Sequence, residues 1–219
     1  MRAFSIAVLM MAGLVSGPAA AETLRFNEGL EGWTKVSFPG VAAADFTASP
    51  DGRLSIATDS AAGMLWHPLP ALAQPPQTAR WRWRVDEGVA ATDLARRGAD
   101  DRAIAVYFVF SDRPAGQRGP MQLLSSSAVT ALVYVFGGDK PRDSVIASPH
   151  MGERGKFIAL RPADANKQVW FDEKVDLAPD YRRAFGRPMP ALIGVAISSD
   201  SDDTRARNRS SLQSFIVGE

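Results

Sequence analysis

Two acidic clusters are the residues of this sequence whose types and spacing best suit chemistry. Each cluster flanks an apolar run: one precedes the run that begins at residue 103, and the other follows the run that ends at residue 198. Carboxylate oxygens that recur along a loop suit a hard cation or a ligand rich in hydrogen-bond donors. If the two loops converge in space, they form a ligand-binding site. The clusters are Asp100 with Asp101, and Asp200 with Asp202 and Asp203.

One prediction for these loops is a structural calcium ion bound by Asp100, Asp101 and Asp202; no other cofactor is expected. The spacing is not that of an EF-hand, because counting from Asp200 the loop glycine is replaced by Arg205. The alternative is that the Asp and Ser side chains bond to nearby backbone and close a turn. Both interpretations stay open from the sequence.

Aromatic side chains are the second candidate group, because a sandwich that binds sugars places rings beneath pyranose faces. Tyr181 therefore joins the five aspartates in the predicted ligand-binding set. The competing interpretation is that most rings belong to the core, since Trp81 and Trp83 share the apolar face of one strand. The rings considered are Trp33, Trp66, Trp81, Trp83, Trp170, Tyr107, Tyr134 and Tyr181.

Enzyme signatures are scarce. His67 and His150 are the two histidines, cysteine is absent, and no H-E-x-x-H, G-x-S-x-G, S-x-x-K or phosphate-cradling motif occurs. This disfavours zinc and serine-nucleophile chemistry. A glycosidase with two carboxylates about 5 to 9.5 Å apart remains open. The pairs to test are Asp101 with Asp202, or Glu173 with either.

The first 21 residues predict a cleavable signal peptide. Arg2 gives a positive start, an uncharged run extends from Ala3 to Val15, and small residues end at Ala21, where we place cleavage. The run is shorter than the roughly 20 residues that a membrane span needs. Residues 22–219 are expected to form one domain with no later membrane-spanning segment.

Charge and composition limit the classes of binding partner that we expect for this protein. Removing residues 1–21 takes away one basic residue and lowers the net charge from +1 to zero, which does not favour nucleic acid or anionic lipid. The alternating Arg80, Arg82 and Arg84 are interpreted as a solvated face paired with carboxylates such as Asp172. The preference for Arg over Lys is typical of GC-rich bacterial genomes, so we expect a periplasmic protein.

Short strand-like segments separated by turn residues must position these groups. Residues 80–85 alternate strictly between Arg and apolar residues, as in a half-buried strand, whereas residues 104–110 and 132–136 are apolar on both faces. The predicted strands cover residues 23–26, 33–38, 54–58, 63–67, 79–85, 103–110, 129–136, 156–160, 168–177, 192–198 and 212–217.

Helical signal is limited to residues 179–186, with Pro near the start and Gly at the end, and to a short turn of helix over residues 92–97. The predicted fold is all-β, a two-sheet antiparallel sandwich of jelly-roll type with one or two short helices. A closed barrel is the structural alternative.

Several short motifs in order resemble a bacterial family of exported proteins. They include Trp81-x-Trp83, Gly98-x-Asp100-Asp101, Asp180-Tyr181, Phe185-Gly186 and the acidic run from Asp200 to Thr204. Over residues 26–217 the chain resembles the family called domain of unknown function 3047. Where that family's acidic motif usually has Asn, this chain has Asp203. The resemblance implies an exported β-sandwich and transfers no catalytic residue.

The sequence therefore predicts an exported, non-catalytic ligand-binding or accessory module of the cell envelope, with a glycan as the candidate ligand. One alternative is a carboxylate-pair glycoside hydrolase. The other is a structural or interaction protein of the envelope.

Overall fold

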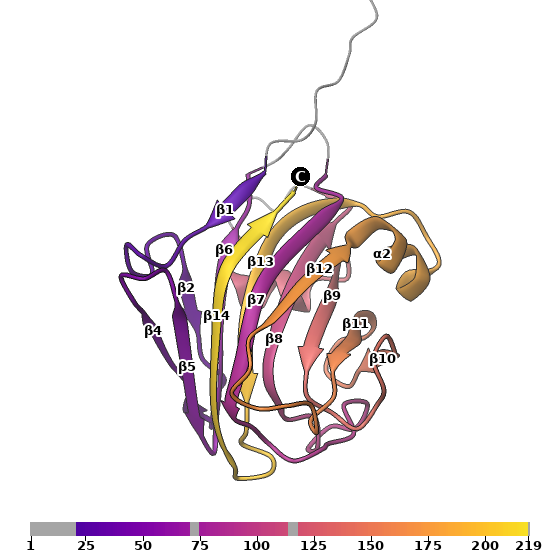
Figure 1. Ribbon diagram of the computed structural model, residues 1–219. Helices are drawn as coiled ribbons and strands as arrows, with labels where there is room; N and C mark the ends of the chain where they lie inside the picture. The colour runs from indigo at the N-terminus through magenta and orange to yellow at the C-terminus, as the bar shows by residue number, and fades with distance from the viewer. Residues whose placement is uncertain (1–20, 71–74, 114–117, 219) are drawn as a thin grey trace, which may run out of the picture.

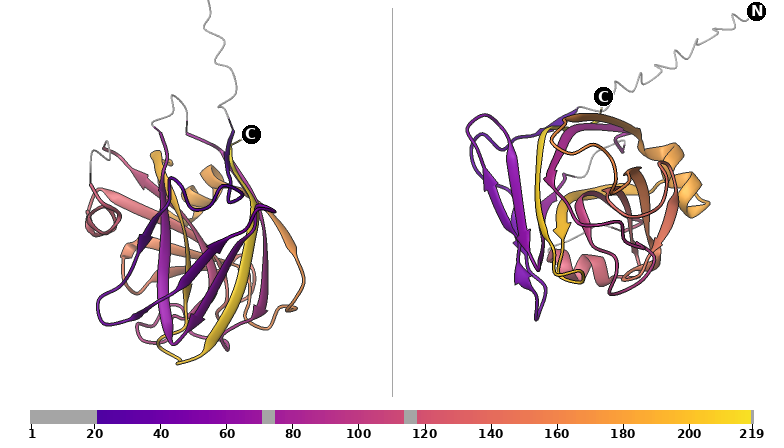
Figure 2. Two further views of the ribbon diagram at one scale, coloured as in Figure 1. Left: turned by 90° about the vertical axis from the view of Figure 1, so that its left-hand side faces the viewer. Right: turned by 60° about the horizontal axis from the view of Figure 1, so that its bottom comes forward.

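The computed structural model describes residues 21–70, 75–113 and 118–218, which form two facing β-sheets and two short helices (Figure 1). The predicted signal peptide lies outside the described residues, apart from Ala21. The two sheets enclose a common interior, as the two views of Figure 2 show. The prediction of a two-sheet sandwich is confirmed, and the sheets do not merge into one closed barrel.

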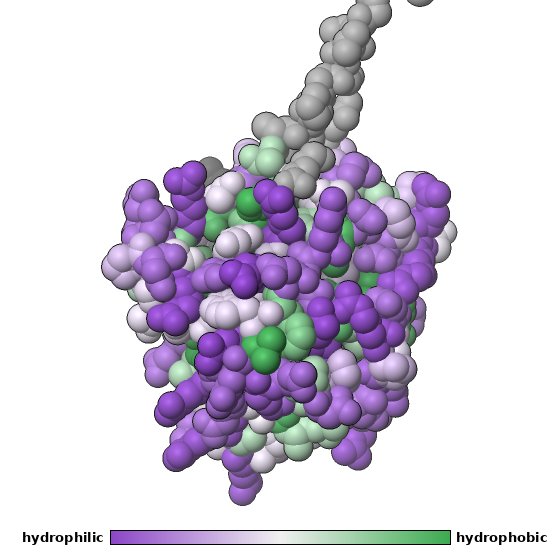
Figure 3. All heavy atoms as spheres, viewed as in Figure 1, coloured by the Kyte–Doolittle hydropathy of each residue, from purple (hydrophilic) through white to green (hydrophobic). Residues whose placement is uncertain are grey.

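The first sheet has six strands in the order β12-β7-β14-β5-β4, with β1 also pairing with β14. Arg82 on β7 binds Asp172 on β12 across the sheet at 2.8 Å, as the alternating pattern predicted. Over β14 and β7 the outer face is mostly hydrophilic (Figure 3). Its strands are β1 (Glu22–Leu24), β4 (Asp45–Ala48), β5 (Leu54–Asp59), β7 (Thr78–Glu87), β12 (Phe171–Asp176) and β14 (Arg207–Val217).

The second sheet has eight strands in the order β10-β11-β9-β8-β13-β6-β2, with β3 beside β6. Two pairs, β9 with β11 and β3 with β6, are parallel, an exception to the expected antiparallel pattern. β9 and β11 are parallel because β10 comes between them in the chain and β11 folds back along β10, so that β11 runs in the same direction as β9. Its strands are β2 (Thr34–Val36), β3 (Ala42–Ala43), β6 (Ala61–Pro68), β8 (Arg102–Ser111), β9 (Val129–Phe136), β10 (Val145–Ser148), β11 (Gly152–Arg161) and β13 (Ala191–Asp200).

The core between the sheets is built on the alternation seen in the sequence. Trp81 and Trp83 are buried on the inner face of β7, where the Trp81 ring lies 6.2 Å from Phe108 and 5.7 Å from Tyr134. Large rings dominate burial energetics, and these pack at tilted or edge-on angles that suit aromatic pairs. The interpretation of these tryptophans as core residues is confirmed.

A second apolar cluster covers the outer face of the eight-stranded sheet. Every residue of β8 and β9 is buried, and alternate side chains such as Tyr107 and Val133 belong to this outer cluster. Leu123 of α1 (Pro120–Ser125) and Leu94 also belong to it, so the sheet is covered on both sides as predicted. The candidate site lies against this outer apolar cluster.

The helices agree with the sequence in one place and differ in another. α2 (Leu177–Phe185) ends at Gly186, whose left-handed φ of 68° suits glycine, as the pattern predicted. Residues 92–97 form turns closed by the Arg96 and Ala99 amides, so the helix expected there is wrong; the second helix is α1. Among the described residues, no helix is long and apolar enough to cross a membrane.

Candidate functional site

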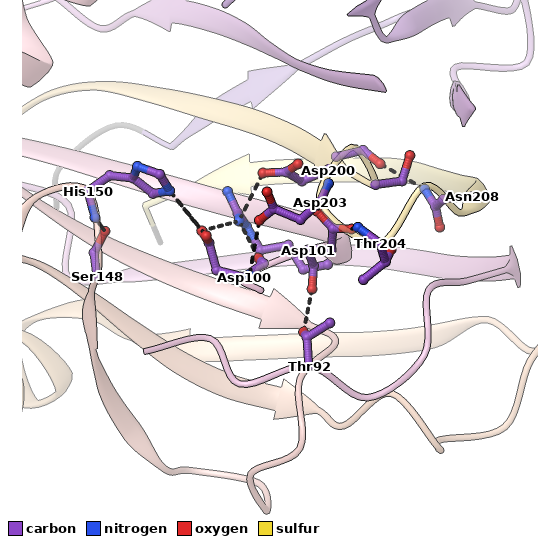
Figure 4. A network of polar contacts seen from close by, with 12 residues as sticks. Thr92, Asp100, Asp101, Ser148, His150, Asp200, Asp203, Thr204 and Asn208 are labelled. Atoms are coloured by element: carbon purple, nitrogen blue, oxygen red, sulfur yellow. Dashed lines mark hydrogen bonds and ion pairs between the residues drawn. The ribbon is translucent and has the colours of Figure 1, made fainter. Parts of the chain in front are cut away.

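The two acidic loops meet because the strands that carry them are neighbours. β13 ends at Asp200 and β8 begins at Arg102, and these two residues are partners in the antiparallel register. The residues just before β8 and just after β13 therefore leave the sheet at the same edge (Figure 4). The sequence placed these residues at strand ends, and the register brings them together.

Asp101 fastens one loop to the other. Its side chain is fully buried and accepts hydrogen bonds from the backbone N–H of Asp203 at 3.3 Å, from the N–H of Thr204 at 2.7 Å and from the Thr204 hydroxyl. The Asp101 carbonyl in turn accepts from the hydroxyl of Thr92. Asp101 therefore has a structural role: it joins the two loops from inside the protein, and its side chain does not face outward.

Arg102 is the cation at the centre of the cluster. Its Nη1 donates to the Asp100 carbonyl at 2.8 Å and contacts carboxylate oxygens of Asp100 at 3.4 Å and Asp200 at 3.3 Å, while Nη2 donates to the Tyr107 hydroxyl at 2.7 Å. Burial alone would lower the pKa of Arg102, but Tyr107 and the two carboxylates raise it. The guanidinium lies over the Phe157 ring, and its Nε has no hydrogen-bond partner.

His150 contacts Asp100 at the rim of the acidic cluster. Nε2 of His150 lies 3.1 Å from both carboxylate oxygens of Asp100. The Asp100 side chain is 2% exposed and that of His150 is 55% exposed, so the imidazole meets solvent while its partner is enclosed. Burial acts to raise the pKa of Asp100, but His150 and Arg102 outweigh it and hold that pKa below its usual value.

The carboxylates on the other loop behave in the opposite way. Burial raises the pKa of Asp200 to about 8 in spite of Arg102, and the neighbouring Asp202 carboxyl adds to the rise. Oδ1 of Asp200 has no hydrogen-bond donor within reach. Burial also raises the pKa of Asp203, helped by the charges of Asp101 and Asp202. Burial is therefore the main reason why both carboxyl groups keep their protons to a higher pH than usual.

One group of three carboxylates among the described residues has the spacing to hold a metal ion. Asp101, Asp200 and Asp202 can each offer an oxygen within 4.8 Å of the others. The calcium set expected from the sequence had Asp100 in the place of Asp200, but the Asp100 carboxylate contacts Arg102 and His150. Since Asp101 already accepts three hydrogen bonds, we assign no ion to this group.

The acidic cluster forms one end of a pocket of about 570 Å³ on the outer face of the eight-stranded sheet. Side chains of the outer apolar cluster, with α1 and the segment after β2, form the remaining wall. Arg154 holds the end of α1 by donating to the carbonyls of Leu124, Ser126 and Val129. The lining residues include Met64, Asp100, Arg102, Tyr107, Met121, His150, Arg154, Phe157, Asp200, Asp202 and Asp203.

Of the residues predicted to bind ligand, four line this pocket and two do not. Asp100, Asp200, Asp202 and Asp203 face it, and Asp101 lies behind them. Sequence reasoning missed Arg102 and His150 as members of the site. The adjacency of Arg102 to the acidic pair was the available signal for the first, whereas nothing local marks the second.

Tyr181 lies away from the pocket. It is fully buried in the core between the sheets, where its hydroxyl bonds to Thr130 at 2.8 Å and its ring lies 4.9 Å from Phe110. Glu173, named in two of the candidate acid pairs, is also distant from the pocket lining, since it is buried on β12 against Arg161 at 2.6 Å. The structure brings neither residue to the acidic loops.

Three solved structures illustrate what the chain is similar to. The xyloglucanase domain of NopAA from Sinorhizobium fredii aligns at 8% identity over 92% of this chain and 96% of that chain, with a TM-score of 0.47. Lectin II from Ulex europaeus aligns at 12% identity over 92% and 99%, with a TM-score of 0.43. A mutant of the carbohydrate-binding module CBM29-2 aligns at 10% identity over 91% and 85%, with a TM-score of 0.41.

Comparison of the sequence with family models shows to which family the chain belongs. No curated protein matches the chain. A family model matches residues 31–216, which is most of the sequence and includes both acidic loops and the whole pocket lining. The chain therefore belongs to the family described as protein of unknown function, DUF3047.

Proposed function

We propose that this protein is an exported, non-catalytic glycan-binding module of the cell envelope, and that the pocket on the eight-stranded sheet is its binding site. One observation carries the proposal: a single pocket joins an apolar wall to one polar end. Met64, Tyr107 and Phe157 belong to the wall, and carboxylates form the end. Sugars present the matching pair of surfaces, an apolar C–H face and an edge of hydroxyl donors.

The size of the pocket and the carboxylate oxygens in its lining support this proposal. A volume of about 570 Å³ lies within the range of roughly 300 to 1,000 Å³ typical of small-ligand sites. At the polar end, Asp202 and Asp203 add carboxylate oxygens to the pocket lining. Carboxylate oxygens accept hydrogen bonds, and the hydroxyl groups of a sugar can donate them.

The experiment is a glycan array with residues 22–219, followed by calorimetry on each ligand that binds. Met121→Glu, on the exposed rim of α1, should abolish binding because it places a charge on the apolar wall. Val169→Glu is the matched control, since Val169 is similarly exposed but does not line the pocket. Absence of any glycan ligand, or binding that Met121→Glu leaves unchanged, would contradict the proposal.

A second function, glycosidic hydrolysis, is favoured by one specific observation. Asp100 and Asp200 both line the pocket and both contact Nη1 of Arg102, yet their pKa values move in opposite directions. A protonated acid beside an ionised carboxylate is the arrangement that carboxylate-pair glycosidases use. Release of new reducing ends from a bound glycan, lost in Asp200→Asn, would favour hydrolysis over simple binding.

A further inference from the structure

The outer faces of the two sheets differ in chemistry. Arg82 and Asp172 pair on the outer face of the six-stranded sheet, and over β14 and β7 this face is mostly hydrophilic, as expected for a surface in water (Figure 3). On the eight-stranded sheet, the outward side chains include Met64, Tyr107 and Val133, which belong to the outer apolar cluster. An apolar face of this kind is stabilised by whatever removes it from water.

Within the described residues, the chain itself covers only part of this apolar face. Leu94 and Leu123 of α1 are buried against the sheet and cover one part of it. The pocket of about 570 Å³ lies beside them, and most of the residues that line it are apolar. Met121 of α1 lines the pocket and is 48% exposed, so water contacts the apolar wall here. The pocket is therefore a part of the face that another molecule can cover.

Little of the wall offers the flat aromatic surface on which a pyranose packs. The Phe157 ring is 2% exposed, and the guanidinium carbon of Arg102 lies 5.3 Å from its centre. Tyr107 is 6% exposed, and its hydroxyl accepts a hydrogen bond from Arg102. Among the described lining residues, Phe38 is the one aromatic ring that is more than marginally exposed. The larger part of the wall must therefore bind something other than a sugar ring.

The remaining side chains of the wall are aliphatic, and three of them are methionines. Met64 on β6, Met121 on α1 and Met151 in the turn between β10 and β11 come from three separate elements. Val41 and Leu124 lie in the same lining. Methionine is unbranched and has a polarisable sulfur, so it adapts its shape to irregular apolar surfaces. Such a wall suits a flexible alkyl chain.

We propose that the ligand is a glycolipid, whose alkyl or acyl chain packs against Met121, Met151 and Leu124 while its sugar lies at the acidic end of the pocket. This inference rests on the proposed glycan-binding function and adds an apolar chain to the ligand. Asp202 and Asp203 line the acidic end, so an uncharged sugar suits it better than the carboxylate of a free fatty acid.

A series of alkyl β-glucosides tests the inference by calorimetry on residues 22–219, below the micelle concentration of each compound. The methyl, butyl, hexyl and octyl compounds share one sugar and differ only in chain length. Each methylene buried in an apolar site raises affinity by up to about fourfold, so octyl glucoside should bind at least about 20-fold more tightly than butyl glucoside. The heat capacity change of binding should become more negative as the chain grows.

Met121→Gln is the informative variant, because Met121 is exposed and Gln has a similar length and helix propensity. We expect it to weaken octyl glucoside at least about fivefold, since an amide replaces an apolar contact with the chain. Methyl glucoside, measured as a competitor of octyl glucoside, should change by less than about twofold. Val169→Gln is the matched control at an exposed apolar residue outside the pocket lining and should change neither. Melting temperatures verify that both variants fold.

The outcomes separate this inference from the function beneath it. Equal affinities for butyl and octyl glucoside, or octyl glucoside binding that Met121→Gln leaves unchanged, would overturn the glycolipid inference and leave glycan binding standing. Stronger binding of octanoate than of octyl glucoside would replace the glycolipid with a fatty acid. An octyl tetra(ethylene glycol) ether that binds as tightly as octyl glucoside would keep the chain site and overturn glycan recognition. Failure of every compound, together with an empty glycan array, would overturn both.

Discussion

Replacing Asp101 by Ala should destabilise the protein more than any other single change in the acidic loops. The buried carboxylate accepts two backbone N–H groups and the Thr204 hydroxyl, and a hydrogen bond to a charged group is worth about 1.5 to 3 kcal/mol. Because bonds that share one acceptor are not additive, we expect the free energy of unfolding to fall by about 3 to 5 kcal/mol. Thr204→Val removes one donor and should cost about 1 to 2 kcal/mol.

Urea unfolding monitored by tryptophan fluorescence measures this change, since Trp81 and Trp83 are buried in the core between the sheets. A total stability of about 5 to 15 kcal/mol leaves a loss of this size easily resolved. In the double variant, the Thr204 change should cost almost nothing once Asp101 is gone. A loss below about 1 kcal/mol for Asp101→Ala, or fully additive effects, would refute the view that Asp101 fastens the two loops.

Three further predictions concern Glu173, Asp200 and Arg154. Glu173→Gln should cost about 3 to 5 kcal/mol in urea unfolding, because it leaves Arg161 without its buried partner; a loss under 1 kcal/mol would show the pair to be dispensable. Burial raises the pKa of Asp200 from 3.8 to about 8, so between those values the folded state keeps a proton that the unfolded chain has lost. Wild-type stability should then fall as pH rises, by at most about 1.4 kcal/mol per unit, and Asp200→Asn should gain relative to wild type across pH 4 to 8; a constant difference would contradict the raised pKa. Arg154→Met should speed amide exchange in α1 and weaken ligand binding; unchanged exchange would mean that Arg154 does not hold the helix.

The fold was largely predictable because burial imposes simple periodicities. Strict alternation in β7 identified the inner face of one sheet, and the unbroken apolar runs of β8 and β9 identified strands covered on both sides. The second helix was placed wrongly, because a one-turn helix such as α1 carries almost no periodic signal. The parallel pairing of β9 with β11 depends on how β10 folds back, which local sequence does not determine.

The candidate site was predictable only where it follows from strand ends. Asp100 and Asp200 were identified because each adjoins a strongly apolar strand, but their contact depends on β8 and β13 being neighbours in the sheet. His150 comes from a loop 50 residues beyond Asp100, and nothing near it in the sequence marks its role. Tyr181 shows the opposite error: its ring was expected to lie beneath a bound sugar, and it is instead buried in the core between the sheets.

Asp200 offers a way to tell a binding role from a purely structural one. At neutral pH the buried carboxyl is mostly protonated, so Asn is close to it in both shape and charge and should leave the contact with Arg102 tolerable. If the carboxyl served only the fold, Asp200→Asn would leave ligand affinity unchanged. If the carboxyl is kept for a ligand, the same variant should be at least as stable as wild type above pH 4 and should bind more weakly, because sites built for binding retain groups that the fold alone does not favour. Calorimetric titration of a glycan that binds on the array, paired with urea unfolding of the same samples, distinguishes these two accounts.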